Sequence, residues 1–182
     1  MKPSRANPTQ LPVTLPLLAA LICVLILAGA LWQQRLGFAP CPLCILQRIA
    51  YLAVLFLALA AAILSRRRAV AAARGAAVLA VLAVLACMTG FGVAAKHVWL
   101  VWHPGQTCGL DPLAVTINHW AISQWLPWMF RADGFCADTP YLLGQSLPLW
   151  SALGFLLLAA LLVIAILGTP RARDRNMAIQ SD

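Results

Sequence analysis

Four stretches of this chain are almost purely apolar, and each is long enough to cross a lipid bilayer as a helix. A helix needs roughly 20 apolar residues to span the hydrocarbon. The four windows cover about residues 14–32, 45–64, 76–95 and 148–168. Between the third and fourth windows, residues 96–147 form the one long extramembrane segment. The pattern predicts an all-α integral membrane protein, a bundle of four transmembrane helices that makes a single domain of residues 1–182.

The first window has one feature of a secretory signal peptide, because Ala28-Gly29-Ala30 resembles a cleavage site. Its apolar run is longer than the roughly 7–15 residues of a signal peptide's apolar region. We therefore expect this window to be a retained helix.

Composition agrees with a membrane protein and gives its orientation. The chain is 63% hydrophobic and 10% charged, and its net charge is +8. Nine of its thirteen basic residues fall in residues 1–13, 65–75 and 169–182, which lie on one side of a four-span chain. The positive-inside rule makes that side cytoplasmic, together with both termini. The positive charge is therefore explained by the orientation of the chain in the membrane and does not indicate a nucleic-acid partner. Residues 33–44 and 96–147 are then the outer loops.

A CxxC motif directly precedes the second apolar window, within the stretch Pro40-Cys41-Pro42-Leu43-Cys44-Ile45-Leu46-Gln47-Arg48. Such a pair can form a disulfide, bind a metal ion or cycle between the two redox states. Both prolines suit the first positions of a helix, whose N-terminus favours a thiolate at Cys44. Arg48 follows Cys44 at i+4 and so shares its helix face. An arginine inside an apolar span is costly unless it has a task; the alternative is a side chain that snorkels to the headgroups. The adjacent cysteines favour redox function.

A second cysteine pair, Cys108 and Cys136, lies in the long outer loop. Alone it would be read as a structural disulfide, worth about 3–4 kcal/mol by loop closure. Cys41 and Cys44 face the same compartment, and disulfides exchange by thiolate attack. Two pairs within reach of each other can pass two electrons from one to the other.

The long outer loop also carries most of the aromatic residues that suit a membrane surface. All seven tryptophans lie at or beyond the outer ends of the windows, as in an interfacial aromatic belt. Residues 119–126 fit a short helix lying on the membrane, or else a loop covered by aromatic side chains. Small residues near the outer end of the third window, Gly90, Gly92, Ala94 and Ala95, predict close helix packing, with room for a flat ligand as the alternative.

Other site chemistries have less support. None of the five acidic residues lies in a window, which leaves a proton relay or cation transporter little to work with. A zinc site formed by Cys41, Cys44 and a histidine is conceivable, but the chain has no second CxxC and no HxxxH motif, so we expect no metal. Cys23 and Cys87 lie within windows and are read as packing residues.

Three histidines complete the candidates. His103 and His119 are expected on the surface of the outer loop. His97, beside Lys96, either approaches the region of Arg48 or is a simple interfacial histidine.

The chain resembles the disulfide bond formation protein B (DsbB) family of quinone-dependent oxidases of the bacterial inner membrane. The resemblance rests on the CxxC-xxQR stretch of residues 40–48, on Lys96-His97 as a turn before Cys108, on Gly134-Phe135-Cys136-Ala137-Asp138, and on Leu143-Gly144 with Pro148-Leu149-Trp150. It covers nearly the whole length. Leu147 departs from the pattern, because a methionine is expected there near the quinone pocket.

The resemblance implies a redox relay on the periplasmic side. Cys108 would form a mixed disulfide with a DsbA-type thioredoxin-like protein. Cys136 would then attack Cys41 and release Cys44 as a thiolate toward ubiquinone, or menaquinone without oxygen. Arg48 matches the family's quinone-site arginine, and His97 matches a nearby pocket residue.

Three alternatives stay open at this point. One is a paralogous oxidase with a dedicated partner, or an oxidase like vitamin K epoxide reductase. The second is a non-catalytic membrane scaffold stapled by disulfides. The third is metal binding.

Overall fold

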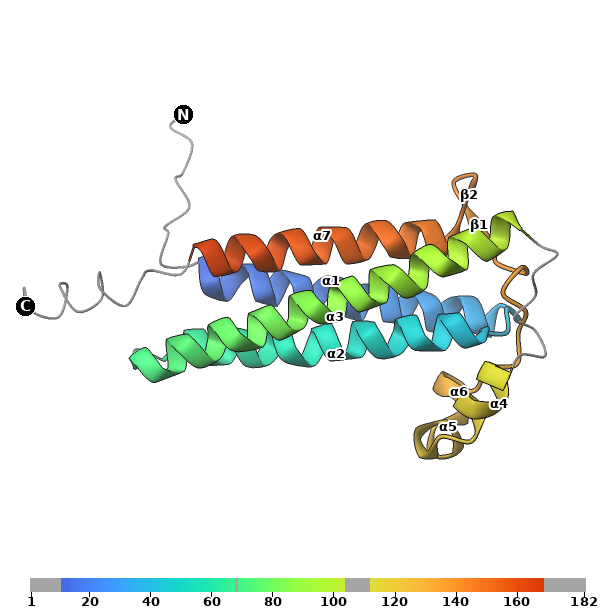
Figure 1. Cartoon of the computed structure of the whole chain (residues 1–182), viewed down its shortest axis with the longest axis horizontal. Coiled ribbons are helices and arrows are strands. Elements are labelled where there is room, and N and C mark those ends of the chain that lie inside the picture. Colours follow the sequence, from blue (N-terminus) through green and yellow to red (C-terminus); the bar gives the residue numbers. More distant parts are fainter. Residues whose placement is uncertain (1–10, 68, 104–111, 169–182) are drawn as a thin grey trace, which may run out of the picture.

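Four long helices dominate the computed structural model, which describes residues 11–67, 69–103 and 112–168 (Figure 1). They are α1 (Leu11–Arg35), α2 (Pro42–Ser65), α3 (Val70–Trp102) and α7 (Leu147–Leu167). Each is long and apolar enough to cross a membrane. Consecutive helices run in opposite directions along the bundle (Figure 1). The predicted four-helix membrane fold is confirmed.

The outer surface of the bundle is as apolar as its interior. Large side chains such as Leu25, Phe56 and Leu167 are exposed, although each sits in a long helix. In water such a surface would be unstable, whereas in lipid, apolar side chains on the outside carry no cost. The distribution of exposed residues therefore agrees with a bundle surrounded by lipid.

Helix α3 is longer than the sequence pattern predicted. The prediction ended the third span at residue 95, but the helix continues to Trp102 and is 33 residues long. The chain from residue 96 to 103 contains no proline or glycine that would end a helix. Lys96-His97 is therefore part of a helix, and the expectation of a turn there was wrong.

Close packing at the middle of the bundle depends on Gly90. A Cβ atom there would collide with the ring of Phe155 in α7. That ring stacks on Tyr51 of α2, with centroids 4.0 Å apart. The predicted packing role is confirmed for Gly90 and for Ala94, which is fully buried, whereas Gly92 is exposed and meets nothing.

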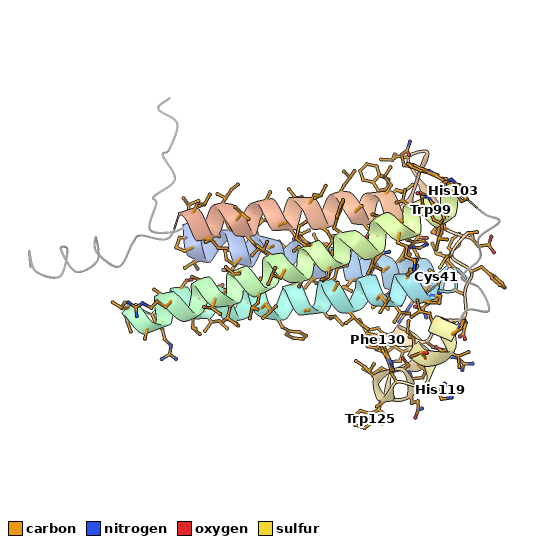
Figure 2. All side chains as sticks on the ribbon, in the orientation of Figure 1. Cys41, Trp99, His103, His119, Trp125 and Phe130 are labelled. Carbon is orange, nitrogen blue, oxygen red and sulfur yellow. The ribbon has the colours of Figure 1, made fainter. Side chains whose placement is uncertain are left out.

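Three short helices form a small lobe beside the outer end of α2: α4 (Pro112–Asn118), α5 (Ala121–Trp125) and α6 (Pro127–Phe130) (Figure 1). The single helix expected over residues 119–126 is thus only five residues long, because Pro127 begins another helix. The lobe packs on α2 through Ile117 and Phe130, which contact Ile45. Trp125 projects from the lobe and is largely exposed (Figure 2). Its contact with a membrane surface stays a prediction.

A two-stranded hairpin, β1 (Tyr141–Leu142) and β2 (Gln145–Ser146), leads into α7 and was not predicted. Its two turn residues, Leu143 and Gly144, both have positive φ values of 52° and 77°. Glycine adopts that conformation readily, which explains its place in the turn. The indole N–H of Trp150 donates to the carbonyl of Leu142 and ties the hairpin to α7.

Candidate functional site

The CxxC motif forms the first turn of α2. Cys41 is the N-cap, and its Sγ accepts a hydrogen bond from the backbone N–H of Cys44 at 3.3 Å. Pro42 follows at the first helical position, where a missing N–H loses no helical bond. Both cysteines are free thiols, with their sulfur atoms 3.1 Å apart. The sequence around the motif thus places two thiols in contact at the outer end of the bundle.

The two thiols are not equivalent. Cys41 is buried, whereas Cys44 is partly exposed. The Cys41 thiol donates its hydrogen bond to the Cys44 sulfur, and this bond, together with burial, raises the pKa of Cys41. Cys41 therefore holds its proton, and the accepting sulfur of Cys44 carries the greater negative character.

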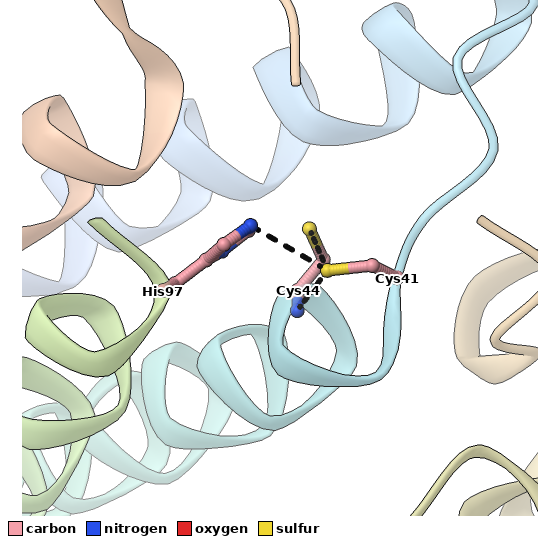
Figure 3. Close-up of side chains that lie close together, drawn as sticks. All are labelled: Cys41, Cys44 and His97. Carbon is pink, nitrogen blue, oxygen red and sulfur yellow. Dashed lines mark hydrogen bonds between the residues drawn. The ribbon is translucent and has the colours of Figure 1, made fainter. Parts of the chain in front are cut away.

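His97 of α3 lies directly against this pair (Figure 3). It is buried, and its Nε2 is 3.7 Å from the Sγ of Cys41 and 3.1 Å from the carbonyl oxygen of Cys136. The side-chain amide of Gln47 lies 3.2 Å from the other ring nitrogen, Nδ1. The interpretation of His97 as a simple interfacial residue is therefore wrong. It connects α2 to the outer loop.

Arg48 is buried one turn below Cys44. Its Nη1 donates to the Oε1 of Gln34 at 2.9 Å and to the carbonyl of Met129 at 2.7 Å, and its Nη2 donates to the carbonyl of Ala30 at 3.3 Å. These partners are neutral, and in the described part of the chain the one ion pair is that of Arg131 with Asp133. The guanidinium is thus fixed in place while its charge stays uncompensated. The snorkelling alternative is wrong, because Arg48 is 6% exposed.

The outer loop brings Cys136 onto the CxxC motif. The backbone N–H groups of Asp133 and Gly134 both donate to the carbonyl of Pro40. A Cβ atom at Gly134 would collide with the carbonyl of Ala39, so this approach requires glycine. Cys136 is then buried in one cluster with Cys41. It is disulfide-bonded, and its expected partner, Cys108, lies outside the described residues.

A cavity of about 260 Å³ opens beside these groups. Cys44, Arg48 and His97 line it, along with apolar side chains of α1 and α7, and the walls are mostly apolar. Leu147, which stands where a methionine was expected, is one of these lining residues. A flat apolar ring that bears oxygen atoms fits this lining, since Arg48 supplies N–H donors at one wall.

Several residues of the site were not predicted. Gln47 was visible as a polar residue inside an apolar window, and that was a usable signal. Gln34 and the backbone carbonyl of Met129, which hold Arg48, carry no sequence signal because they come from other elements. The sequence left open which histidine could join Cys41 and Cys44, and the structure places His97 there, with the three ligand atoms within 4.8 Å of one another. No second metal motif marks it in the sequence.

Two core cysteines and two surface histidines lie where the sequence predicted them. Cys23 and Cys87 are free thiols buried in the hydrophobic core, as expected of packing residues. His103 and His119 are exposed, and each bonds a backbone carbonyl four residues earlier (Figure 2).

Comparison with known proteins places these features in a family. The family model described as disulfide bond formation protein DsbB matches residues 12–165. Disulfide bond formation protein B 1 of Pseudomonas fluorescens strain Pf-5 is 38% identical over 162 residues, which cover 87% of this chain and 90% of that protein. Disulfide bond formation protein B of Ralstonia nicotianae is 37% identical over 157 residues, covering 85% of this chain and 94% of that protein. The protein of the same name from Herminiimonas arsenicoxydans is 39% identical over 147 residues, covering 79% and 88%.

Proposed function

Since this chain belongs to the disulfide bond formation protein DsbB family, we propose that it re-oxidises a soluble, thioredoxin-like dithiol protein of the DsbA type and passes the electrons to a membrane quinone. Membership makes it a multi-pass membrane protein of disulfide bond formation, with disulfide oxidoreductase activity. The soluble partner, the quinone (ubiquinone, or menaquinone) and the roles of single residues belong to the proposal.

We place the chain in the bacterial inner membrane, with the CxxC end facing the periplasm and both termini cytoplasmic. The basic residues Arg66 and Arg67 directly follow α2, whereas Cys41 precedes it. The 24 residues of α2 separate the two ends by about 36 Å at 1.5 Å per residue. That distance exceeds the hydrocarbon thickness of about 30 Å. The thiols and the basic residues therefore face opposite compartments.

One observation carries the proposal: the free thiol of Cys41 and the disulfide-bonded Cys136 are buried members of the same cluster. Thiol–disulfide exchange needs direct attack of one sulfur on another. The anchoring of the loop through Gly134, and the contact of His97 with both Cys41 and the Cys136 carbonyl, keep the two segments together. This arrangement is what an internal exchange between the pairs requires.

The proposed relay consists of thiol–disulfide exchanges followed by one oxidation. A thiolate of the reduced partner attacks Cys108 and releases Cys136, and the partner's second thiol then displaces Cys108, so the partner leaves oxidised. Cys136 attacks Cys41 in the Cys41–Cys44 disulfide and releases Cys44 as a thiolate. Attack of Cys108 on Cys136 restores the loop disulfide and frees Cys41. Each complete exchange moves two electrons inward and leaves the inner pair as a dithiol, the state seen here.

The last stage oxidises this dithiol. A quinone bound in the cavity would supply the oxidant, accepting the two electrons and two protons released when the dithiol closes to a disulfide. Arg48 lines the cavity and bears an uncompensated charge, so it stabilises negative charge on the sulfur of Cys44 and on oxygen atoms at that wall. The mostly apolar lining excludes water from both groups.

The proposal is tested by anaerobic mixing of the purified full-length chain with a reduced DsbA-type protein and ubiquinone. We expect quinone absorbance to fall in step with formation of the partner's disulfide. Cys44→Ser should abolish this turnover. Cys23→Ala, which removes a buried thiol of the core, should retain it. Absence of quinone reduction with the unmodified chain would favour a stapled scaffold, and turnover with a different thioredoxin-like protein alone would favour a dedicated paralogue.

Orientation is tested separately by labelling thiols from the periplasmic side of spheroplasts after reduction. Cys41 or Cys44 and Cys108 should react from that side. Labelling of Cys41 and Cys108 from opposite sides of the membrane would exclude electron transfer between the pairs.

A further inference from the structure

We propose that the dithiol form of this site, Cys41 and Cys44 together with His97, binds one Zn²⁺ ion, and that the bound ion holds the inner cysteine pair reduced. Zinc prefers thiolate sulfur and imidazole nitrogen, and sites with three protein ligands keep a fourth position open for water. The donor set here, two sulfurs and one ring nitrogen, is of that kind. The binding of zinc is independent of the proposed function, whereas its inhibitory consequence rests on it.

The ligand atoms already stand close to tetrahedral spacing. With Zn–S near 2.3 Å and Zn–N near 2.0–2.1 Å, ligand atoms in a tetrahedral centre are separated by about 3.5–3.8 Å. The Sγ of Cys41 is 3.7 Å from the Nε2 of His97. All three ligand atoms lie within 4.8 Å of one another. The sulfurs, now 3.1 Å apart, need only open by a rotation at Cys44, which is the partly exposed member of the pair.

Gln47 is positioned to orient the histidine for this role. A histidine that binds a metal through Nε2 usually donates its Nδ1–H to a carbonyl or carboxylate, which fixes the ring. The side-chain amide of Gln47 lies 3.2 Å from Nδ1. A flip of that amide presents its Oε1 as the acceptor, so Nε2 loses its proton and is freed for the metal. Nε2 then exchanges its bond to the Cys136 carbonyl for a bond to zinc.

The charge balance suits a buried position. Zinc binding releases two thiol protons, so a 2+ ion meets two thiolates and a neutral imidazole, and the centre has no net charge. A neutral group escapes most of the desolvation cost that an isolated buried ion pays. The cavity beside Cys44 gives the ion a path of entry and leaves room for water at the fourth position.

Zinc binding and disulfide formation exclude each other at these sulfurs. Only the dithiol offers two thiolates, and closing the disulfide takes both ligand sulfurs from the metal. Conversely, a bound ion occupies the electron pairs with which the thiolates would react. The site is therefore expected to take up zinc after electrons arrive from the outer loop and to release it on oxidation.

The binding test uses the full chain in detergent with Cys108 and Cys136 both changed to serine, so that reduction exposes no other outer thiols. Zn²⁺ is titrated and counted by mass spectrometry, and Co²⁺ replaces it as a spectroscopic probe of thiolate ligands and tetrahedral geometry. We expect one ion per reduced chain and none after oxidation of Cys41 and Cys44. His97→Ala should weaken zinc binding by at least about tenfold. His103→Ala, an exposed histidine of the same helix end, should leave it unchanged.

Three outcomes would overturn the site. They are no stoichiometric binding by the reduced chain, equal binding after Cys41→Ser and Cys44→Ser, and binding that is insensitive to His97. Binding that is insensitive to His97 would mean that the two cysteines hold the ion without a third protein ligand. His97→Gln, with circular dichroism and size-exclusion profiles, separates loss of a ligand from misfolding.

Inhibition is measured in a separate assay. Quinone reduction should be lost when Zn²⁺ is added and should recover when a chelator removes the ion. Zinc binding without any quinone reduction by the metal-free chain would refute the proposed function and leave the site intact. Quinone reduction by a chain that binds no zinc would refute the site alone.

Discussion

Replacement of Arg48 by alanine is the sharpest test of how the cavity works. A guanidinium has five N–H donors. Three of these are used: both N–H groups of Nη1, and one of Nη2. The Nε–H group and the second Nη2–H have no described partner, and Arg48 lines the cavity. Two donors and a full positive charge therefore remain for a molecule bound there.

The expected loss follows from these two donors. A hydrogen bond to a charged group is worth about 1.5–3 kcal/mol, and removal of one such donor at a site of developing charge costs about 100-fold to 1000-fold in rate. Since 1.36 kcal/mol corresponds to about tenfold, we expect kcat/KM for quinone to fall by about 100-fold in Arg48→Ala, with a raised apparent KM. Exchange between the soluble partner and the loop disulfide should persist, because the hydrogen bonds of Arg48 go to Gln34, Met129 and Ala30 and not to the cysteines.

The assay follows quinone absorbance at several quinone concentrations, alongside gel-based trapping of the partner exchange. Arg131→Ala is the matched control, since this arginine belongs to the same loop region but is exposed and paired with Asp133. Quinone kinetics unchanged by Arg48→Ala would refute the role given to its free donors. Loss of partner exchange together with quinone use would show that Arg48 acts by holding the loop in place.

Two further predictions concern the outer loop. Cys136→Ala leaves Cys108 without its loop partner, so the Cys108 thiolate can attack the disulfide of the oxidised soluble protein and release one of its thiols. A mixed disulfide between Cys108 and that protein should then accumulate on non-reducing gels, whereas a scaffold would form none. Gly134→Ala forces a collision with the Ala39 carbonyl, which we expect to cost about 1–3 kcal/mol and to slow internal exchange in rapid-quench experiments. Gly92→Ala, where a Cβ meets nothing, should behave as the unmodified chain; equal rates for both variants would contradict the anchoring role of Gly134.

The positions of the helices along the chain could be predicted from the sequence, but the side of each helix that contacts its neighbours could not. Apolar windows of about 20 residues give the spans directly, because the bilayer fixes their length. Both faces of such a helix are apolar, so no periodicity tells which side meets a neighbour. The burial of His97 against Cys41 depends on how α3 is rotated against α2, and two residues in different helices give no local sign of their contact.

The candidate site also has a part that the sequence predicts and a part that it does not. The pairing of Cys44 with Arg48 on one helix face follows from i+4 spacing within a single helix. The groups that hold Arg48 come from α1 and from the outer loop, at Gln34 and Met129. One of them is a backbone carbonyl, which every residue possesses and no sequence distinguishes. Local chemistry was therefore predictable, and the long-range contacts that position it were not.

The hydrogen bond from Arg48 to the Met129 carbonyl joins the bundle interior to the outer loop. A molecule that drew the Nη1 group as well as the free donors toward the cavity would weaken the attachment of α6 to the bundle. By reciprocity, a soluble protein that pulls this region outward changes affinity in the cavity by the same factor. Communication between the two ends of the electron path then needs no moving helix, only competition for a single cation.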